Sequence, residues 1–218
     1  DIVVHSITKF ISGSSDVIAG TVCGTESFIG ELMDLHMGPL MLLGPTMDPG
    51  IASSVSLRIP HLPLRMAEHG KRAFELSRRL DELGMTVTYP GLEKHPDHEL
   101  FNALRSAEYG YGGVFTLDVN DAETANDLMS RLQNEQRFGY LAVSLGYFDT
   151  LMSCSGSSTS SEMSEDDQRS AGISPGLVRI SAGYTGTLEQ RWSQLQAALN
   201  DAGIVNAHGD TENEKRRA

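Results

Sequence analysis

The spacing of apolar residues between positions 73 and 199 most constrains the fold. In three stretches an apolar residue recurs every three or four positions, which predicts three helices with one apolar face each. These faces hold Ala73, Leu76, Leu80 and Leu83, then Ala125, Leu128 and Leu132, then Leu188, Trp192, Leu195 and Leu199. Residues 85–89, 112–119 and 176–181 have the composition and alternation of strands. The pattern predicts a small α+β layer, in which a sheet packs helices on one side.

Residues at the ends of these stretches support the helix limits. Gly84 follows the first helix and suits a left-handed C-terminal cap. Asp121 precedes the second helix and can cap its N-terminus. Thr187 precedes the third helix, where Gln190 completes a capping box. Each predicted helix therefore has a start or stop residue of the expected type.

The first 58 residues do not fit this layer. Residues 1–5 carry a continuous apolar run, typical of a strand buried on both faces, and residues 16–24 predict a second strand. Neither has a predicted neighbour nearby, so we expect both to need a different, larger sheet. We also expect the chain to be the C-terminal piece of a longer protein. Glycine–proline turn signals divide residues 26–58 into short pieces, which predicts a connector or part of a pocket wall.

Composition and charge limit the partners. The chain has 218 residues and a formal net charge of −12, with no basic cluster for phosphate backbones, so we expect no nucleic acid partner. No apolar run is long enough to span a bilayer, so we expect no membrane partner. Only Cys23 and Cys154 occur, which is too few for a disulfide framework and favours a cytoplasmic location.

Two polar segments are predicted to be flexible. Residues 153–171 are rich in serine and acidic residues, and this composition alone favours a solvated loop. Residues 206–218 form a polar tail without core residues, which we predict to be disordered.

The chemistry of Lys9 is suggestive because the residue follows a predicted buried strand, where ligands collect in open α/β sheets. Ser6 and Thr8 flank Ile7 and can present hydroxyls to a phosphate on one side of an extended backbone. A lysine amine beside phosphate donors is the arrangement expected for pyridoxal phosphate (PLP). A lone lysine after a strand is more often solvated, so the residues alone leave both interpretations open.

Five segments resemble a known family, in the family's order and at compatible spacing over about residues 1–200. They are DIVVHSITKFISGSSDVIAG, LRMAEHGKRA, YPGLEKHPDHEL, AVSLGYFDTLM and GLVRISAGY. The chain is identified through them as a member of the Cys/Met-metabolism family of PLP-dependent enzymes. That family includes cystathionine gamma-synthases, cystathionine lyases and methionine gamma-lyases, and LMLLGPTM and LMSCSGSSTSSE are most similar to the plant methionine gamma-lyases. Ser14 departs from the histidine that many members have there.

The resemblance implies a cofactor and the residues that hold it. By position, Lys9 matches the catalytic lysine that holds pyridoxal 5'-phosphate as an internal aldimine and later shuttles protons. Ser6 and Thr8 match the hydroxyls that hold the cofactor phosphate.

The resemblance also implies the substrate-binding residues. Arg179 matches the arginine that binds the substrate α-carboxylate, and Ser144 matches a contact near the same group. Thr159 lines up with a threonine near the lysine, although its surroundings depart from the usual Pro-x-x-Met-Thr-His pattern. In the family this serine-rich segment lies at the mouth of the active site, so the resemblance favours the lip of a pocket over a solvated loop. From the residues alone, Arg179 could equally be an edge-strand residue facing water, and Ser144 a turn serine.

No metal site is predicted. The histidines His5, His69, His95 and His98 are scattered, and no cysteine or carboxylate completes a ligand set at the usual spacing. Capping and packing roles are the better interpretation of these histidines.

The implied fold is the α/β fold of PLP-dependent transferases (aspartate aminotransferase-like, fold type I), of which the chain resembles the C-terminal half. Residues 1–58 would be a remnant of the large PLP-binding domain, residues 59–205 the small α+β C-terminal domain, and residues 206–218 the tail. In relatives, the aspartate under the pyridine nitrogen, the stacked aromatic ring and the Gly-rich phosphate loop all precede the lysine. The family forms homodimers that pair into tetramers, so we expect the same of the full-length protein.

The implied reaction is a gamma-elimination by a PLP-dependent carbon–sulfur lyase that acts on a small amino acid. For L-methionine the products would be methanethiol, 2-oxobutanoate and ammonia. Cystathionine gamma-synthase or gamma-lyase activity shares all the motifs above and stays open. A non-catalytic truncated fragment or paralogue is the alternative of another class, and we expect the isolated chain to be inactive.

Overall fold

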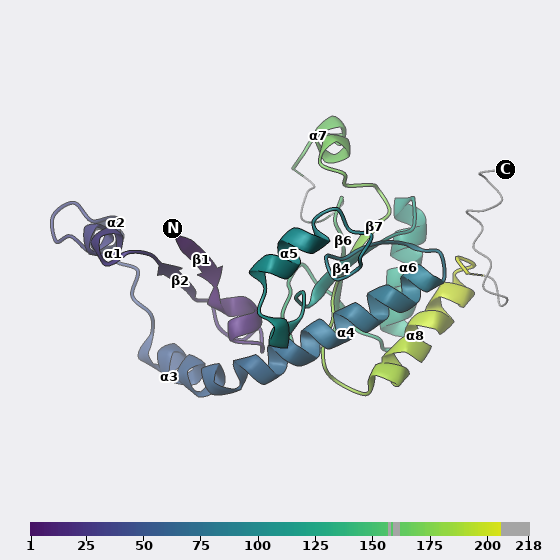
Figure 1. The fold of residues 1–218 in the computed structure, drawn as a ribbon, viewed down its shortest axis with the longest axis horizontal. Helices are drawn as coiled ribbons and strands as arrows, with labels where there is room; N and C mark the ends of the chain where they lie inside the picture. Colours follow the sequence, from purple (N-terminus) through teal and green to yellow (C-terminus); the bar gives the residue numbers. More distant parts are fainter. Residues whose placement is uncertain (157, 159–161, 206–218) are drawn as a thin grey trace. The chain divides into compact units, whose positions relative to one another are not determined.

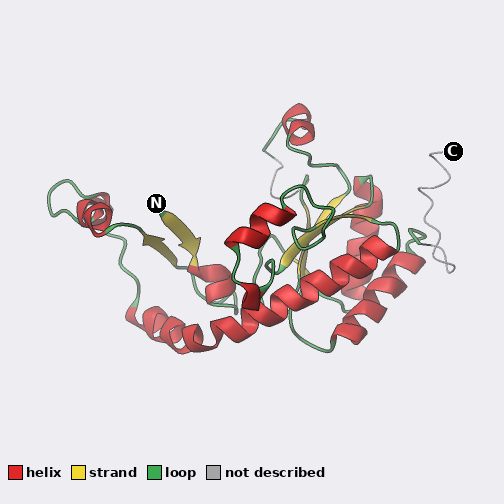
Figure 2. Cartoon of the chain, in the orientation of Figure 1, coloured by secondary structure: helices red, strands yellow, loops and turns green. Residues whose placement is uncertain are grey.

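The computed structural model describes residues 1–156, 158 and 162–205. The chain divides into two compact units, Asp1–Leu62 and Pro63–Ala218. Figures 1 and 2 show the helices and strands of both units. Each unit has its own cluster of buried apolar residues, so each is described by itself.

The first unit contains a small antiparallel sheet. Strand β1 (Val3–Ser6) pairs with β2 (Gly20–Cys23), and the register runs from Val3↔Cys23 to Ser6↔Gly20. All four residues of β1 are exposed, whereas the buried core of this unit consists of Ile7, Val17 and Val55. The prediction that the first strand is buried on both faces is therefore wrong for this part of the chain. The reason is that its sheet has only two strands among the described residues.

Residues 26–58 contain three short helices. The elements are α1 (Glu26–Leu32), α2 (Pro39–Leu43) and α3 (Pro49–Arg58), followed by the 3-10 turn η2 (Ile59–His61). Pro39 and Pro49 lie at the first helical position, where a missing N–H costs nothing. Asp48 caps α3, since its Oδ1 accepts from the amides of Gly50 at 2.8 Å and Ile51 at 3.1 Å. The turn signals at Pro39 and Pro49 therefore mark helix starts.

The second unit is a five-stranded sheet with helices. Its strands lie in the order β3-β4-β7-β6-β5, antiparallel except for the parallel pair β5–β6. The strands are β3 (Thr86–Thr88), β4 (Val114–Asp118), β5 (Tyr140–Leu141), β6 (Leu151–Cys154) and β7 (Leu177–Ser181). The helices are α4 (Leu62–Glu82), α5 (His98–Leu104), α6 (Ala122–Asn134), α7 (Glu165–Ser170) and α8 (Leu188–Asp201), with the 3-10 turn η3 (Ala107–Tyr109).

One apolar core joins the sheet to its helices. The core strand residues alternate along the chain, as Phe115 and Leu117 do on β4 and Val178 and Ile180 on β7. The apolar faces of α4, α6 and α8 complete it, with Leu80, Leu128 and Leu199 fully buried. Arg79 of α4 pairs with Glu189 of α8 at 2.5 Å, and Figure 1 shows these two helices side by side. The predicted layer with helices on one side of a sheet is confirmed.

The predicted helix ends are also confirmed. Gly84 has a φ of +76°, and its amide donates to the carbonyl of Asp81 at 2.9 Å. Asp121 accepts from the amide of Thr124 at 2.8 Å, and Thr187 accepts from the amide of Gln190 at 3.1 Å. Helix α4 begins at Leu62, well before Ala73, where the predicted apolar face begins.

The serine-rich segment 153–171 is not one loop. It begins inside β6, whose four residues are all buried, and it contains α7, capped by the hydroxyl of Ser164. Residues 157 and 159–161, together with the tail 206–218, lie outside the described residues. No helix in the described part of the chain is both long and apolar enough to cross a membrane.

Candidate functional site

Lys9 lies in a tight turn directly after β1. The turn, η1 (Ile7–Ile11), has π-helical hydrogen bonding, but Lys9 itself departs from helical geometry with φ −86° and ψ −122°. The amide of Ser12 donates to the carbonyl of Ile7, and that of Gly13 to the carbonyl of Lys9, both at 2.8 Å. The residue is half-buried. The turn thus gives Lys9 a fixed backbone position at the end of a strand.

The hydroxyl of Thr8 holds the turn to the segment before β2. It accepts from the amide of Ala19 at 3.1 Å and donates to the carbonyl of Ala19 at 3.3 Å. That carbonyl also accepts from the amides of Ile7 at 2.9 Å and Thr8 at 3.3 Å. The Thr8 hydroxyl can therefore donate its hydrogen bond to another acceptor, because the Ala19 carbonyl keeps its two backbone donors. Ser6, the last residue of β1, is exposed.

An arginine clamp fixes the loop after the lysine. Arg58 at the end of α3 donates from Nη1 and Nη2 to the two carboxylate oxygens of Asp16, at 2.6 and 2.7 Å. Nη1 also donates to the hydroxyl of Ser12 at 2.8 Å. The hydrogen bond from Arg58 lowers the pKa of the Asp16 carboxyl. Nothing local in the sequence predicts this contact, because it joins residues far apart along the chain.

Arg179 lies on a central strand. Strand β7 is flanked by β4 and β6, so the alternative of an edge-strand residue facing water is wrong. Since Val178 and Ile180 point into the core, Arg179 lies on the opposite face of the sheet. Its Nη2 donates to the carbonyl oxygen of Ser144 at 2.9 Å. The structure therefore brings the two predicted substrate-binding residues together.

The surroundings of Arg179 suit an anion. The residue is half-buried, and this burial lowers the pKa of its guanidinium with no described carboxylate opposing the shift. Its Nε is buried and has no hydrogen-bond partner among the described residues. A desolvated cation without a counter-charge is stabilised when an anion binds it.

Hydrogen bonds to the sheet fix the loop that carries Ser144. The amide of Gly146 donates to the hydroxyl of Ser181 at 2.9 Å, and the amide of Tyr184 donates to the carbonyl of Phe148 at 2.8 Å. At the end of the loop, the Oδ1 atom of Asp149 accepts from Arg191 at 2.9 Å. The acceptor of Arg179 is thus part of an ordered loop rather than an isolated turn.

Contacts with backbone groups account for the four histidines His5, His69, His95 and His98, and Nδ1 of the exposed His5 lies 3.1 Å from the carbonyl oxygen of Ser6. His69 is fully buried on α4, with Nδ1 2.5 Å from the carbonyl oxygen of Ala182. Nδ1 of His98 lies 2.8 Å from the carbonyl oxygen of Pro90, and that of His95 accepts from the amide of Asp97 at 3.1 Å. These contacts suit packing and capping.

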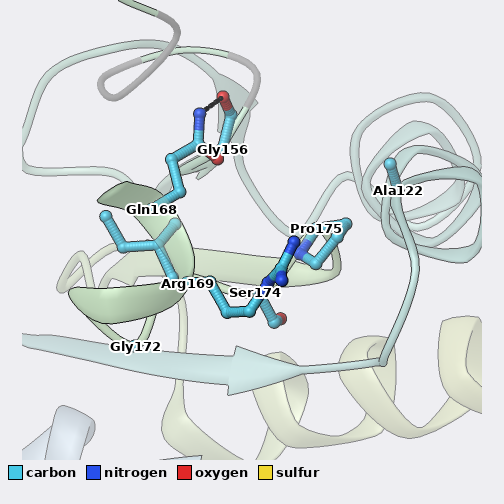
Figure 3. Close-up of a pocket in the computed structure, with 8 residues that line it drawn as sticks. Ala122, Gly156, Gln168, Arg169, Gly172, Ser174 and Pro175 are labelled. Atoms are coloured by element: carbon cyan, nitrogen blue, oxygen red, sulfur yellow. Dashed lines mark hydrogen bonds between the residues drawn. The ribbon is translucent and has the colours of Figure 1, made fainter. Parts of the chain in front are cut away.

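A separate pocket of about 630 Å³ lies beside α7 (Figure 3). Its residues are Ala122, Gly156, Gln168, Arg169, Gly172, Ile173, Ser174 and Pro175. Gln168 closes one side by donating to the carbonyl of Gly156 at 3.4 Å, the dashed contact in Figure 3. Neither Arg179 nor Ser144 lines this pocket, so we assign it no part in binding the carboxylate.

The predicted site residues thus form two groups, each within one unit. Ser6, Thr8 and Lys9 are neighbours in the first unit, and Ser144 and Arg179 are in contact in the second. Thr159 lies outside the described residues. Sequence reasoning missed Ser153, which is the cross-strand partner of Arg179. Only the pairing of β6 with β7 reveals it.

Known proteins match nearly the whole chain. A family model described as "Cys/Met metabolism PLP-dependent enzyme" matches residues 1–200. The chain is 59 % identical over 199 residues to a methionine gamma-lyase of Arabidopsis thaliana, covering 91 % of this chain and 45 % of that protein. It is 30 % identical over 200 residues to cystathionine gamma-synthase 1, chloroplastic, of the same plant, covering 90 % and 34 %.

A solved structure shares the fold. The crystal structure of cystathionine gamma synthase from Xanthomonas oryzae pv. oryzae, in complex with aminoacrylate and cysteine, matches with a TM-score of 0.79 and 30 % identity. The match covers 93 % of this chain and 50 % of that one. The chain therefore spans between about a third and a half of the length of these relatives.

Proposed function

The chain belongs to the family of Cys/Met metabolism PLP-dependent enzymes, and from this premise we propose that the protein carrying it is a carbon–sulfur lyase acting on L-methionine. The fold is the α/β fold type I of that family, and PLP is the family's cofactor. The reaction takes up one water and gives methanethiol, 2-oxobutanoate and ammonia.

The difference in sequence identity carries this proposal. Identity to the Arabidopsis protein named methionine gamma-lyase is 59 %, against 30 % to the cystathionine gamma-synthase of the same plant. Both matches cover about nine-tenths of the chain, so the contrast does not depend on which segment is compared. A gamma-elimination is therefore favoured over a gamma-replacement.

The residues of the first unit fit the cofactor. Lys9 would hold it through Nζ, and its fixed backbone limits where that amine can lie. The exposed hydroxyl of Ser6 can donate to the phosphate. Thr8 can do the same by turning its proton away from the Ala19 carbonyl, which keeps its backbone donors. When bound, PLP would supply an electron sink for the carbon acid of the substrate.

Lys9 and Arg179 would have different tasks. The Nζ of Lys9 would take the proton from Cα of the substrate and return it later, as a general base and acid. Arg179 would bind the α-carboxylate, because a guanidinium fork matches the two oxygens of a carboxylate. The Ser144 carbonyl accepts from Nη2 at 2.9 Å before a ligand is bound. A substrate held in one orientation by its carboxylate would owe much of its reaction rate to that positioning.

Product analysis of the full-length protein, incubated with L-methionine and PLP, tests the proposal. We expect methanethiol and 2-oxobutanoate in equal amounts. Lys9→Ala should abolish both products. Arg179→Lys should raise KM about a hundredfold, because a point charge replaces a bidentate fork. Turnover that persists in Lys9→Ala would contradict the role of Lys9, and an unchanged KM in Arg179→Lys would contradict that of Arg179.

Cystathionine chemistry is the second candidate, because solved cystathionine gamma synthases share the fold at a TM-score of 0.79. An activated homoserine ester offered together with cysteine separates the two. Formation of cystathionine in preference to 2-oxobutanoate would identify a synthase. Failure of the protein to bind PLP at all would favour a non-catalytic product instead.

The remaining assignments extend the same proposal. We propose that the first unit belongs to the cofactor domain and the second unit is the small C-terminal domain. Both thiols, Cys23 and Cys154, are free, which supports a cytoplasmic location.

Self-association into homodimers or tetramers is supported by exposed apolar side chains on one segment of the first unit. They are Met33, Leu35, Met37, Met41, Leu42 and Leu43. Apolar surface gathered in this way marks an interaction site. Analytical ultracentrifugation should show a dimer or larger, and a monomer at micromolar concentration would contradict the proposal.

A further inference from the structure

Two buried polar groups without partners lie on neighbouring strands. The hydroxyl oxygen of Ser153 and the Nε of Arg179 are both buried, and neither has a hydrogen-bond partner among the described residues. Ser153 is only 5 % exposed, so bulk solvent does not reach its hydroxyl. One of these groups is a hydroxyl oxygen that can accept, and the other is an N–H that can only donate.

The register of the sheet places these two residues directly opposite each other. Ser153 of β6 pairs with Arg179 of β7 in an antiparallel ladder. Their chain neighbours Met152, Cys154, Val178 and Ile180 all point into the core, so Ser153 and Arg179 share the other face. Directly opposed residues in such a ladder have Cβ atoms about 4.5–5.5 Å apart. Both side chains therefore project from the same face of the sheet at directly neighbouring positions.

The hydrogen bond from Arg179 to Ser144 explains why Nε of Arg179 and the hydroxyl of Ser153 are not paired with each other. Its Nη2 is held by the carbonyl oxygen of Ser144 at 2.9 Å. We propose that Ser153 is a positioning residue: when a carboxylate binds, the guanidinium shifts so that Nε donates to the Ser153 hydroxyl, and the two Nη groups face the ligand. The inference rests on the proposed role of Arg179 as the carboxylate-binding residue.

Charge explains why a ligand should trigger the shift. Burial disfavours the charged guanidinium, and no described carboxylate opposes this effect. A carboxylate that engages the two Nη groups supplies the missing counter-charge and keeps the buried guanidinium charged, and hydrogen bonds from charged groups are the stronger ones. The buried Nε then gains most from an acceptor, and Ser153 is the cross-strand residue that offers one.

Crystal structures of the PLP-loaded protein, with and without L-norleucine, test the shift directly. Norleucine has the carboxylate and shape of methionine but no sulfur leaving group. We expect Nε of Arg179 to lie within about 3.2 Å of the Ser153 hydroxyl only in the complex. Calorimetric titration then measures the effect on affinity.

Three variants complete the test. Ser153→Ala should weaken norleucine binding about tenfold, because a hydrogen bond to a charged group is lost, and should raise KM for methionine more than it lowers kcat. Ser153→Thr keeps the hydroxyl and should restore the affinity. Ser77→Ala is the matched control, since Ser77 of α4 is another buried serine whose hydroxyl has no partner among the described residues. It should leave the affinity unchanged.

The outcomes separate this inference from the proposed function. If norleucine binds Arg179 while Nε stays away from Ser153, or if Ser153→Ala binds as tightly as the wild type, the inference is overturned and the role of Arg179 stands. If the carboxylate binds elsewhere and Arg179→Lys has no effect, the proposed role of Arg179 fails, and the inference fails with it.

Discussion

Among single residues, His69 should make stability depend on pH. It is fully buried on α4, and burial is the main cause that lowers its pKa, with Arg65 and Arg72 adding to the effect. The contact with the Ala182 carbonyl opposes the shift. The unfolded chain therefore binds a proton at His69 more readily than the folded chain does. The contribution of His69 to the free energy of unfolding is fully present above its ordinary pKa near 6.5 and is lost as the pH falls toward the lowered pKa.

Urea denaturation between pH 7 and pH 5 measures this effect. We expect the free energy of unfolding to fall over that range in the wild type. His69→Gln should flatten the dependence, because the side chain no longer titrates. An equal slope in both proteins would show that other groups dominate.

The role of a residue can be predicted from sequence only where the residues that lie next to it in the fold can be predicted too. Alternation along residues 176–181 predicted a strand, but it could not distinguish a central strand from an edge strand. That distinction depends on β6, a short strand ending in serine and cysteine that the sequence pattern does not predict. Ser153 was missed for the same reason, since its importance comes entirely from pairing with Arg179.

Among elements, α4 packs against a turn so closely that one glycine is required. A Cβ on Gly70 would lie 2.6 Å from the carbonyl oxygen of Tyr109, which is backbone and cannot rotate away. Gly70→Ala should therefore destabilise the chain by about 2 kcal/mol, although alanine favours helices. Gly30 of α1 is the control, because a Cβ there meets nothing within 4 Å. Gly30→Ala should stabilise by up to about 1 kcal/mol. Thermal unfolding of both variants measures these changes in stability. Equal changes for Gly70→Ala and Gly30→Ala would contradict the packing argument.

Helix α8 is tied to three loops through Arg191. The side chain donates to Asp149 at 2.9 Å, to the hydroxyl of Thr185 at 2.6 Å, and to the carbonyl of Arg137 at 2.7 Å. Arg191→Met would leave the Asp149 carboxylate in place without its cation. We expect a loss of about 3 kcal/mol, as for other partly buried ion pairs that lose one partner.

Arg131→Met is the matched control for this change. Arg131 of α6 forms ion pairs with Asp127 and Glu135. Both carboxylates are exposed, and exposed ion pairs contribute little to stability. Denaturant midpoints should thus move for Arg191→Met and hardly for Arg131→Met. Similar midpoints for the two variants would show that the Asp149 contact is not energetically distinct.

Elements with strong periodicity were predictable, and those marked by ambiguous residues were not. The faces of α4, α6 and α8 follow directly from the spacing of leucine and alanine. The helices α2 and α3 were missed because proline signals both a break and a helix start, and Pro39 and Pro49 occupy the first helical position. Strand β1 was expected to be buried because its composition is apolar, whereas burial depends on what covers it.

For the whole molecule, the two units differ in the size of their cores. The second unit buries the faces of three helices against a five-stranded sheet. The only apolar side chains that the first unit buries among its described residues are those of Ile7, Val17 and Val55, and it leaves Val3 59 % and Val4 74 % exposed. Apolar burial is the main favourable term in folding. The first unit should therefore open more often than the second.

Hydrogen exchange measured by mass spectrometry tests this difference. Amides of β1 and β2 should exchange on the order of a hundredfold faster than those of β4 and β7, because local opening is easiest where few apolar contacts must break. Binding of PLP at Lys9 should slow exchange in the first unit selectively, since a ligand stabilises the state that binds it. Lys9→Ala removes that attachment and should abolish the slowing. Equal protection of β1 and β7 without cofactor would mean that the small core is sufficient, and that the first unit is as stable as the second.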